Sequence, residues 1–233
     1  MIGTLINFAS IIIGGGIGLL LGAKISEKIK STIISGLGIF TFLYAISLFL
    51  ETQNSLVVLG SILIGVLIGE WVHMQEGVET LGGWLETRFS KNNAAEDRIR
   101  FIRGFLTTTL IFCIGPMAIL GALEDGLTGN FQTLVIKSIL DGFAAMAFAS
   151  SLGPGVLFSS FMVLLYQGAI ALLAKMIQGV MTETMIGELT ATGGVILAAI
   201  AISNLLEIKR IRTASFIPAL LLAPIIVYLI SIF

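Results

Sequence analysis

This sequence is poor in charged residues. Asp, Glu, Lys and Arg together make up 12% of its 233 residues, whereas hydrophobic residues make up 56% and the mean hydropathy is +1.04. Soluble domains carry roughly 25% charged residues, so an ordinary soluble domain is excluded. The composition indicates a protein that lies in a lipid bilayer, and the net charge of −1 says little about other partners.

Histidine and cysteine are nearly absent, since His73 and Cys113 are the single examples of each. One cysteine excludes an intrachain disulfide and a cysteine-rich metal site, and one histidine without a second ligand identifies no metal. No basic tract with interleaved aromatic residues indicates nucleic-acid binding. No Ser-His or paired-Asp arrangement recurs in the apolar runs, so we expect neither an enzyme nor a cofactor.

Long apolar runs fill most of the chain. A helix needs about 20 apolar residues to cross roughly 30 Å of hydrocarbon, and about eight segments qualify. They are 2–22, 33–50, 55–72, 104–123, 132–150, 155–174, 187–206 and 214–233. The runs are too uniformly apolar to be barrel strands with alternating faces. The predicted fold is therefore an all-α integral membrane protein with about eight transmembrane helices.

The positions of Lys and Arg predict the orientation. Basic clusters follow the first, third and seventh spans, whereas the loops 51–54, 124–131 and 178–186 carry no basic residue. Every basic residue except Lys137 and Lys175 then lies on one side, which is cytoplasmic by the positive-inside rule. We therefore expect a multi-pass protein with both termini outside. The first span is too long for the apolar core of a signal peptide and should be retained.

The longest polar segment, 73–103, lies on the predicted cytoplasmic side. Apolar residues recur in it at three- and four-residue spacing: Val78, Leu81, Leu85 and Phe89. This pattern predicts an amphipathic helix over 76–90 that lies on the inner leaflet.

Two spans share a sequence pattern. The run GIFTFLYAISLFLE at 38–51 matches GVILAAIAISNLLE at 194–207 in its first and last residues and in the central Ala-Ile-Ser. When the match is extended to the neighbouring spans, the first three spans, at 2–72, correspond to the last three spans, at 155–233. We call these two sets the triplets, and the segment 104–154 lies between them. Corresponding spans of the two triplets are five spans apart along the chain. Because five is odd, the two triplets have opposite orientations in the membrane, as in inverted-repeat transporters. This 3+2+3 arrangement is a hypothesis.

Helix-breaking residues concentrate between the triplets. Gly115 and Pro116 interrupt the fourth span, and because proline lacks a backbone N–H they predict a kink or break there. Backbone groups released by a break must face protein, water or ligand. We interpret a second break, Gly153-Pro154-Gly155, as the turn between the fifth and sixth spans. The alternative is a re-entrant segment that reaches the site.

Asp141 lies in the fifth span, where a carboxylate is expensive and usually functional. It stands about nine residues, or roughly 14 Å, into the span, close to the bilayer midplane. Lys137 is four residues earlier on the same helical face, so the two can pair. Either they neutralise one another for structural reasons, or Asp141 is a titratable or cation-binding carboxylate with Lys137 as a competing charge. The sequence leaves both open.

Four further polar residues are candidates. Glu124 and Asp125, at the outer end of the fourth span, form either a cation-attracting vestibule or a solvated turn, and we favour the turn. Asn7 and Gln167 lie in the matched halves of the proposed repeat, so both join Asp141 as candidate site residues.

Glycines recur every four residues on two spans: Gly14, Gly18 and Gly22 on the first, and Gly65 and Gly69 on the third. This spacing lets helix backbones approach closely. It is compatible with a homo-oligomer but does not establish one, because packing within one chain uses the same spacing.

Several runs resemble one family: GTLINFASIIIGGGIGLLLG (3–22), CIGPMAILGALEDGLTGN (113–130), KSILDGFAAMAFASSLGPGVLFS (137–159) and YQGAIALLA (166–174). They are similar to the bacterial YqgA/YdfK-like membrane proteins, classed as domain of unknown function 554. The family pattern includes the positions Gly115, Pro116, Asp125, Gly126, Lys137, Asp141 and Gly142. The resemblance implies a bacterial cytoplasmic (inner) membrane protein and brings no established substrate.

Two classes of function remain. The first is a transporter or channel for a small ion or solute, with a site near the midplane around Asp141 and the Gly115-Pro116 break. The alternative is a membrane scaffold or regulator that acts through the cytoplasmic segment 73–103.

Overall fold

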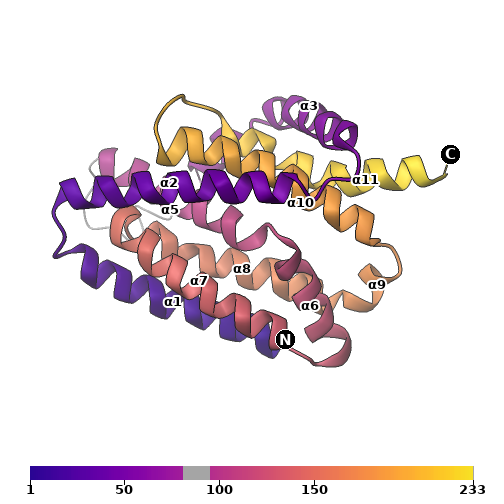
Figure 1. Cartoon of the computed structure of the whole chain (residues 1–233), viewed down its shortest axis with the longest axis horizontal. Helices are drawn as coiled ribbons and strands as arrows, with labels where there is room; N and C mark the ends of the chain where they lie inside the picture. The colour runs from indigo at the N-terminus through magenta and orange to yellow at the C-terminus, as the bar shows by residue number, and fades with distance from the viewer. Residues whose placement is uncertain (81–94, 233) are drawn as a thin grey trace. The chain divides into compact units, whose positions relative to one another are not determined.

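The computed structural model describes residues 1–80 and 95–232, and every regular element in these ranges is helical (Figure 1). Six of the described helices are long and apolar enough to cross a membrane, and the number rises to eight if each of two bent pairs is one span. The prediction of an all-α membrane protein is confirmed.

The elements follow the predicted spans. They are α1 (Ile2–Gly22), α2 (Glu27–Phe49), α3 (Ser55–Trp71), α5 (Ala95–Cys113), α6 (Pro116–Thr128), α7 (Gln132–Leu152), α8 (Gly155–Leu172), α9 (Ala174–Gln178), α10 (Glu183–Ile200) and α11 (Pro218–Ile232). A π-helical turn, η1 (Ala201–Leu205), continues α10, and a 3-10 turn, η2 (Thr213–Phe216), precedes α11.

The fourth predicted span is broken at Gly115 and Pro116. Helix α5 ends at Cys113, α6 begins at Pro116, and the two axes differ by 61°. Gly115 has a φ of 127°, which other residues rarely adopt, and proline at the first helical position needs no N–H partner. The second break is the short turn between α7 and α8, where Gly153 has a φ of 83°.

The predicted amphipathic helix over 76–90 falls largely outside the described residues. Its beginning belongs to a short helix, Met74–Thr80, which bends by 60° from Ser55–Trp71. Whether the segment lies on the inner leaflet stays a prediction.

The chain divides into two compact units. The first comprises Met1–Leu37 and Gly82–Gly179, and the second comprises Gly38–Leu81 and Val180–Phe233. Each predicted triplet therefore contributes helices to both units. The inverted repeat stays a hypothesis.

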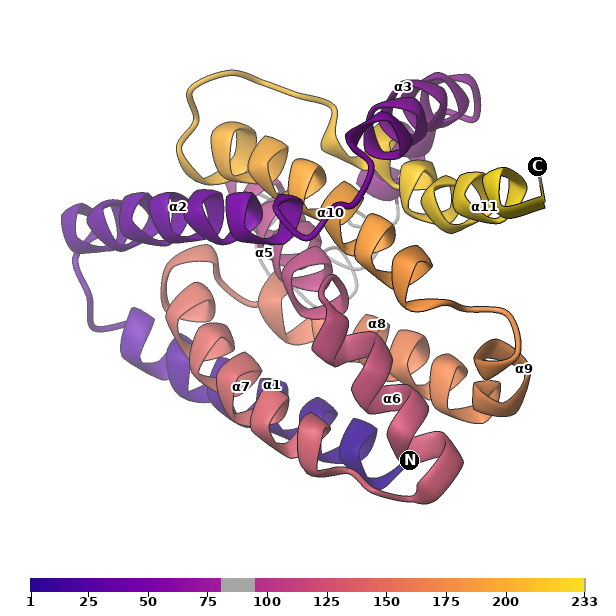
Figure 2. The same cartoon turned by 45° about the vertical axis from the view of Figure 1, so that its right-hand side comes forward.

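In the first unit, α1 and α7 lie side by side (Figures 1 and 2). A β-carbon on Gly14, Gly18 or Gly22 would collide with the backbone carbonyl of Gly142, Met146 or Ser150, respectively. The contacts advance in the same direction along both helices, so α1 and α7 are parallel. The glycine stripe on the first span is thus used for packing within the chain.

The second unit uses glycines in the same way. Gly65 packs on Ala219 and Gly69 on the carbonyl of Ser215, so α3 runs antiparallel to the segment that leads into α11. On α10, a β-carbon at Gly194 would lie 2.8 Å from the Phe49 amide nitrogen of α2. These glycines therefore give no evidence for a homo-oligomer.

Candidate functional site

Four polar side chains are joined by hydrogen bonds in the first unit: Asn7 on α1, Lys137 and Asp141 on α7, and Gln167 on α8. Thr4 is also buried, one helical turn before Asn7 on the same face of α1. We call these five residues the polar cluster. Thr4, Asn7 and Gln167 are 0% exposed, and the two charged residues are each 6% exposed. Burial of this much polarity is costly unless the groups find partners.

The Asp141 carboxylate is the centre of the cluster. Its Oδ2 accepts a hydrogen bond from the Lys137 ammonium at 2.6 Å and another from the Asn7 amide at 3.0 Å. The same Asn7 nitrogen also lies 3.4 Å from Gln167 Oε1, so the three helices are joined through Asn7. The structure thus brings together four of the residues predicted from the sequence.

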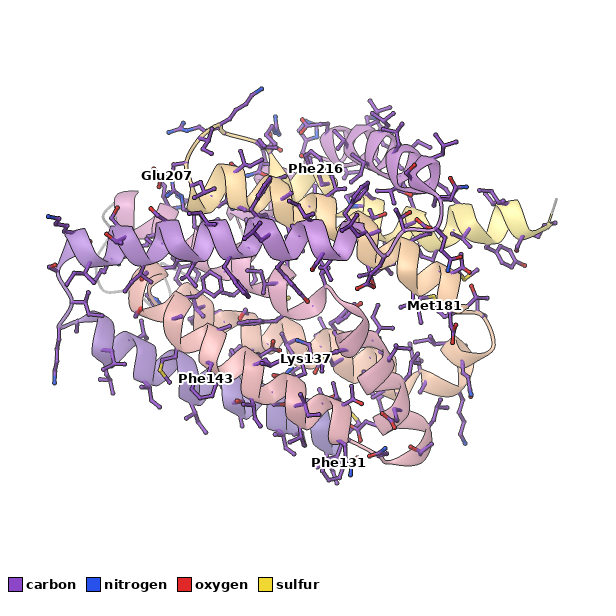
Figure 3. The ribbon with its side chains drawn as sticks, viewed as in Figure 1. Phe131, Lys137, Phe143, Met181, Glu207 and Phe216 are labelled. Carbon is purple, nitrogen blue, oxygen red and sulfur yellow. The ribbon has the colours of Figure 1, made fainter. Side chains whose placement is uncertain are left out.

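Helix α7 has one buried face and one exposed face. Lys137 and Asp141 lie on the buried face, whereas Phe143 is 68% exposed (Figure 3). Asp141 is the tenth residue of this 21-residue helix, so it lies near its midpoint. A carboxylate at this position in a spanning helix is far from both membrane surfaces.

The packing of α1 against α7 positions Asn7. Gly142 lacks a side chain, so Ser10 can approach the α7 backbone, and the Ser10 hydroxyl donates to the Ser138 carbonyl at 2.6 Å. Asn7 is one turn before Ser10 and faces the same helix. Its amide nitrogen donates to the Asp141 carboxylate at 3.0 Å.

Three buried atoms of the cluster lack a hydrogen-bond partner among the described residues: Asn7 Oδ1, Gln167 Nε2 and Thr4 Oγ1. The amide orientations follow from the neighbours. The Asn7 nitrogen must face the carboxylate, since an oxygen there would be repelled, and Gln167 must then turn its oxygen to Asn7. A buried group without a partner costs about 1–3 kcal/mol. A further hydrogen-bonding molecule that reached the cluster would satisfy these atoms.

Glu124 and Asp125 occupy other positions. Both were expected in a loop, but α6 continues to Thr128, so that expectation was wrong. Asp125 is 3% exposed and accepts hydrogen bonds from the Gly3 amide at 3.0 Å and the Met1 amino group at 2.8 Å. A carboxylate at a helix N-terminus stabilises the helix dipole, which accounts for its burial.

Glu124 joins α6 to the start of α7. Its carboxylate accepts from the Asn130 amide at 2.6 Å and the Thr133 hydroxyl at 3.0 Å. Among the described interactions, none connects Glu124, Asp125, Gly115 or Pro116 directly to the polar cluster.

Sequence reasoning missed two residues. Thr4 stands three residues before Asn7, a spacing that puts both on one helical face and could have revealed Thr4 as a candidate.

The second missed residue is Glu188, on α10 in the second unit, which is 1% exposed. It accepts from the Thr52 hydroxyl and from the Gln53 and Asn54 amides at 2.7, 2.8 and 2.9 Å. A carboxylate inside the predicted span 187–206 was the available signal.

No group of three or more His, Cys, Asp and Glu side chains that could hold a metal ion occurs in the described part of the chain. The polar cluster has one carboxylate, and an ammonium already occupies it. Hard cations prefer several oxygen ligands, so the described residues do not build a metal centre.

Fold and site together define a multi-pass helical membrane protein with a buried polar cluster. The chain belongs to the family described as "Protein of unknown function (DUF554)", which matches residues 2–228. This confirms the resemblance seen in the sequence.

Two relatives cover almost the whole chain. "Uncharacterized protein YqgA" from Escherichia coli strain K12 is 32% identical over 223 residues, which are 96% of this chain and 94% of YqgA. "Uncharacterized membrane protein YdfK" from Bacillus subtilis strain 168 is 28% identical over 237 residues, which are 100% of this chain and 98% of YdfK. No solved structure matches the chain.

Proposed function

We propose that this protein is a transporter or channel for a small ion or solute, and that the polar cluster around Asp141 is its binding site. One observation carries the proposal. Near the middle of an apolar helix, a buried ion pair is joined to two amides, and each amide keeps one polar atom without a partner among the described residues.

A purely structural ion pair accounts for less of this arrangement. Lys137 and Asp141 neutralise one another, and apolar residues of similar volume would pack equally well without the desolvation cost. The pair alone does not explain why positions 7 and 167 carry amides, because Asn7 Oδ1 and Gln167 Nε2 have no hydrogen-bond partner among the described residues. A ligand that completes their hydrogen bonds gives such a reason.

The break between α5 and α6 supports a transport path in the same unit. Pro116 has no N–H to offer the carbonyl one turn earlier in α5, so the bend leaves backbone acceptors without helical partners. In a membrane such groups must face protein or a water-filled cavity. Broken helices near the midplane are typical of transporters.

We further propose that 2–72 and 155–233 are inverted repeats. The corresponding helices of the two triplets are neighbours and run antiparallel. On α1 and α8, Gly15 approaches Leu157 while Gly168 approaches Met1. The α2–α10 and α3–α11 pairs are also neighbours, and the contacts advance in opposite directions. An inverted repeat produces opposite directions in all three pairs.

The orientation is part of the proposal. Basic residues on one side support a bacterial inner-membrane protein with both termini outside. The parallel packing of α1 and α7 supports the eight-span topology, because in it the first and fifth spans cross the membrane in the same direction. The alternative of a scaffold acting through 73–103 has less support, since Gln75 and Glu76 are already engaged by Ala214 and Arg212 of the same unit.

The proposal is tested by flux into proteoliposomes. Monovalent and divalent cations, protons and small polar solutes are compared for the native protein, Asp141→Asn, and Ser159→Ala as a control. Ser159 is buried on α8, and its one hydrogen bond within the described residues goes to the Val156 carbonyl of its own helix, so its loss should leave flux unchanged. We expect Asp141→Asn to abolish flux of the transported species. No protein-dependent flux of any probe would refute transport.

A further inference from the structure

The charges and free hydrogen-bonding atoms of the polar cluster point to one class of cargo. We propose that the site takes a small, uncharged polar solute bearing both a hydrogen-bond donor and an acceptor, such as an amide or a polyol. This inference rests on the proposed transport function and narrows it.

The charge of the cluster is already balanced. Lys137 Nζ lies 2.6 Å from Asp141 Oδ2. These two residues are the charged members of the five, and their charges are opposite. A cation that entered would face the ammonium, and an anion would face the carboxylate. Either ion would leave a net charge in a buried site, which is strongly unfavourable far from water. An uncharged solute leaves the balance unchanged.

The free atoms of the cluster offer both kinds of hydrogen bond. Asn7 Oδ1 can only accept, Gln167 Nε2 can only donate, and the Thr4 hydroxyl can do either. Thr4 and Asn7 are three residues apart on α1, so their free atoms lie on one face of the helix. A solute with an N–H or O–H and a carbonyl or hydroxyl oxygen would satisfy all three.

The burial of these atoms limits the size of the solute. Thr4, Asn7 and Gln167 are 0% exposed, so the described conformation is closed around them. Entry therefore requires a movement of α1 or α8, and a solute of a few heavy atoms needs the smallest such movement. Urea, acetamide and glycerol match these requirements and serve as probes.

The experiment follows the volume of proteoliposomes by stopped-flow light scattering. Vesicles are exposed to a hyperosmotic gradient of urea, acetamide or glycerol, and the rate of re-swelling reports entry of the solute. Potassium, sodium and proton fluxes are measured on the same vesicles. We expect protein-dependent entry of at least one uncharged probe and no protein-dependent ion flux.

The variants test the free atoms directly. Thr4→Val removes a hydroxyl that has no partner in the described ranges of the chain, so the fold should be retained. Solute entry should slow by about tenfold, the effect of one hydrogen bond. Gln167→Met should have a similar effect. Ser159→Ala on α8 is the matched control and should match the native rate. Melting temperatures of all variants identify any that fail to fold.

The outcomes separate this inference from the proposed function. Ion flux that depends on Asp141, without entry of any uncharged probe, would overturn the inference and leave transport standing. Entry of uncharged probes at native rates in Thr4→Val and Gln167→Met would overturn the assignment of the site. If neither ions nor uncharged probes cross, the proposed function itself fails.

Discussion

The Lys137–Asp141 pair can be tested by a double-mutant cycle that measures stability and flux together. The variants are Lys137→Met, Asp141→Leu and the double variant, in which apolar side chains of similar volume replace both charges. The cycle separates the two readings of the pair, because a structural pair and a transport site respond differently when both charges are removed.

The magnitudes follow from the contacts. Removing one partner of a buried pair leaves the other charge uncompensated, which typically costs about 3–5 kcal/mol. Asp141→Leu should cost more than Lys137→Met, because Oδ2 of Asp141 accepts from both Lys137 and Asn7. Replacing both charges should cost about 0–1 kcal/mol, since two apolar residues need no partner. The double variant is therefore expected to be more stable than either single variant.

Stability is measured by reversible unfolding in detergent with increasing SDS, and flux is measured in proteoliposomes. If the cluster is a transport site, the double variant is stable and inactive. A stable double variant with native flux would show that the pair is structural. If the double variant loses the sum of the single losses, the two charges do not interact, and the reasoning from the 2.6 Å contact is refuted.

Three further predictions concern the fold. Gly14→Ala should lower the free energy of unfolding by about 1–3 kcal/mol, because its β-carbon would meet the Gly142 carbonyl. Gly16 has open space beside it, so Gly16→Ala should be neutral or slightly stabilising. Equal unfolding free energies for the two variants would contradict the close α1–α7 packing. Glu188→Gln should lower the unfolding free energy by about 1–3 kcal/mol by weakening its bonds to the chain before α3, and an unchanged unfolding curve would argue against them. Arg212→Ala should change the same quantity by less than about 1 kcal/mol, since its ion pairs are half exposed; a larger loss would mean that they form a coupled network.

Local rules predicted the helices and the ion pair. Spans of apolar residues are long enough to be recognised one at a time, and the four-residue spacing of Lys137 and Asp141 places them together on any helix. Pro116 marked the break in the fourth span for an equally local reason, the missing N–H.

Contacts between distant segments could not be predicted in the same way. Asn7 reaches Asp141 only because glycines let α1 approach α7, a property of both helices at once. A turn was expected at Glu124 and Asp125, yet α6 continues to Thr128. The missing side chain of Gly126 lets α6 pack closely against the Ala171 carbonyl of α8. Packing there overrides the local preference of glycine.

The parallel contact between α1 and α7 has a consequence for biogenesis. Gly22 ends the first helix, and its partner helix begins 110 residues later at Gln132. At a synthesis rate of roughly 5–20 residues per second, α7 begins to be made on the order of 5–20 s after α1 is complete. During synthesis the amide of Asn7 has no carboxylate to bind. The first helix to be made can therefore reach its final place only after α7 has been synthesised.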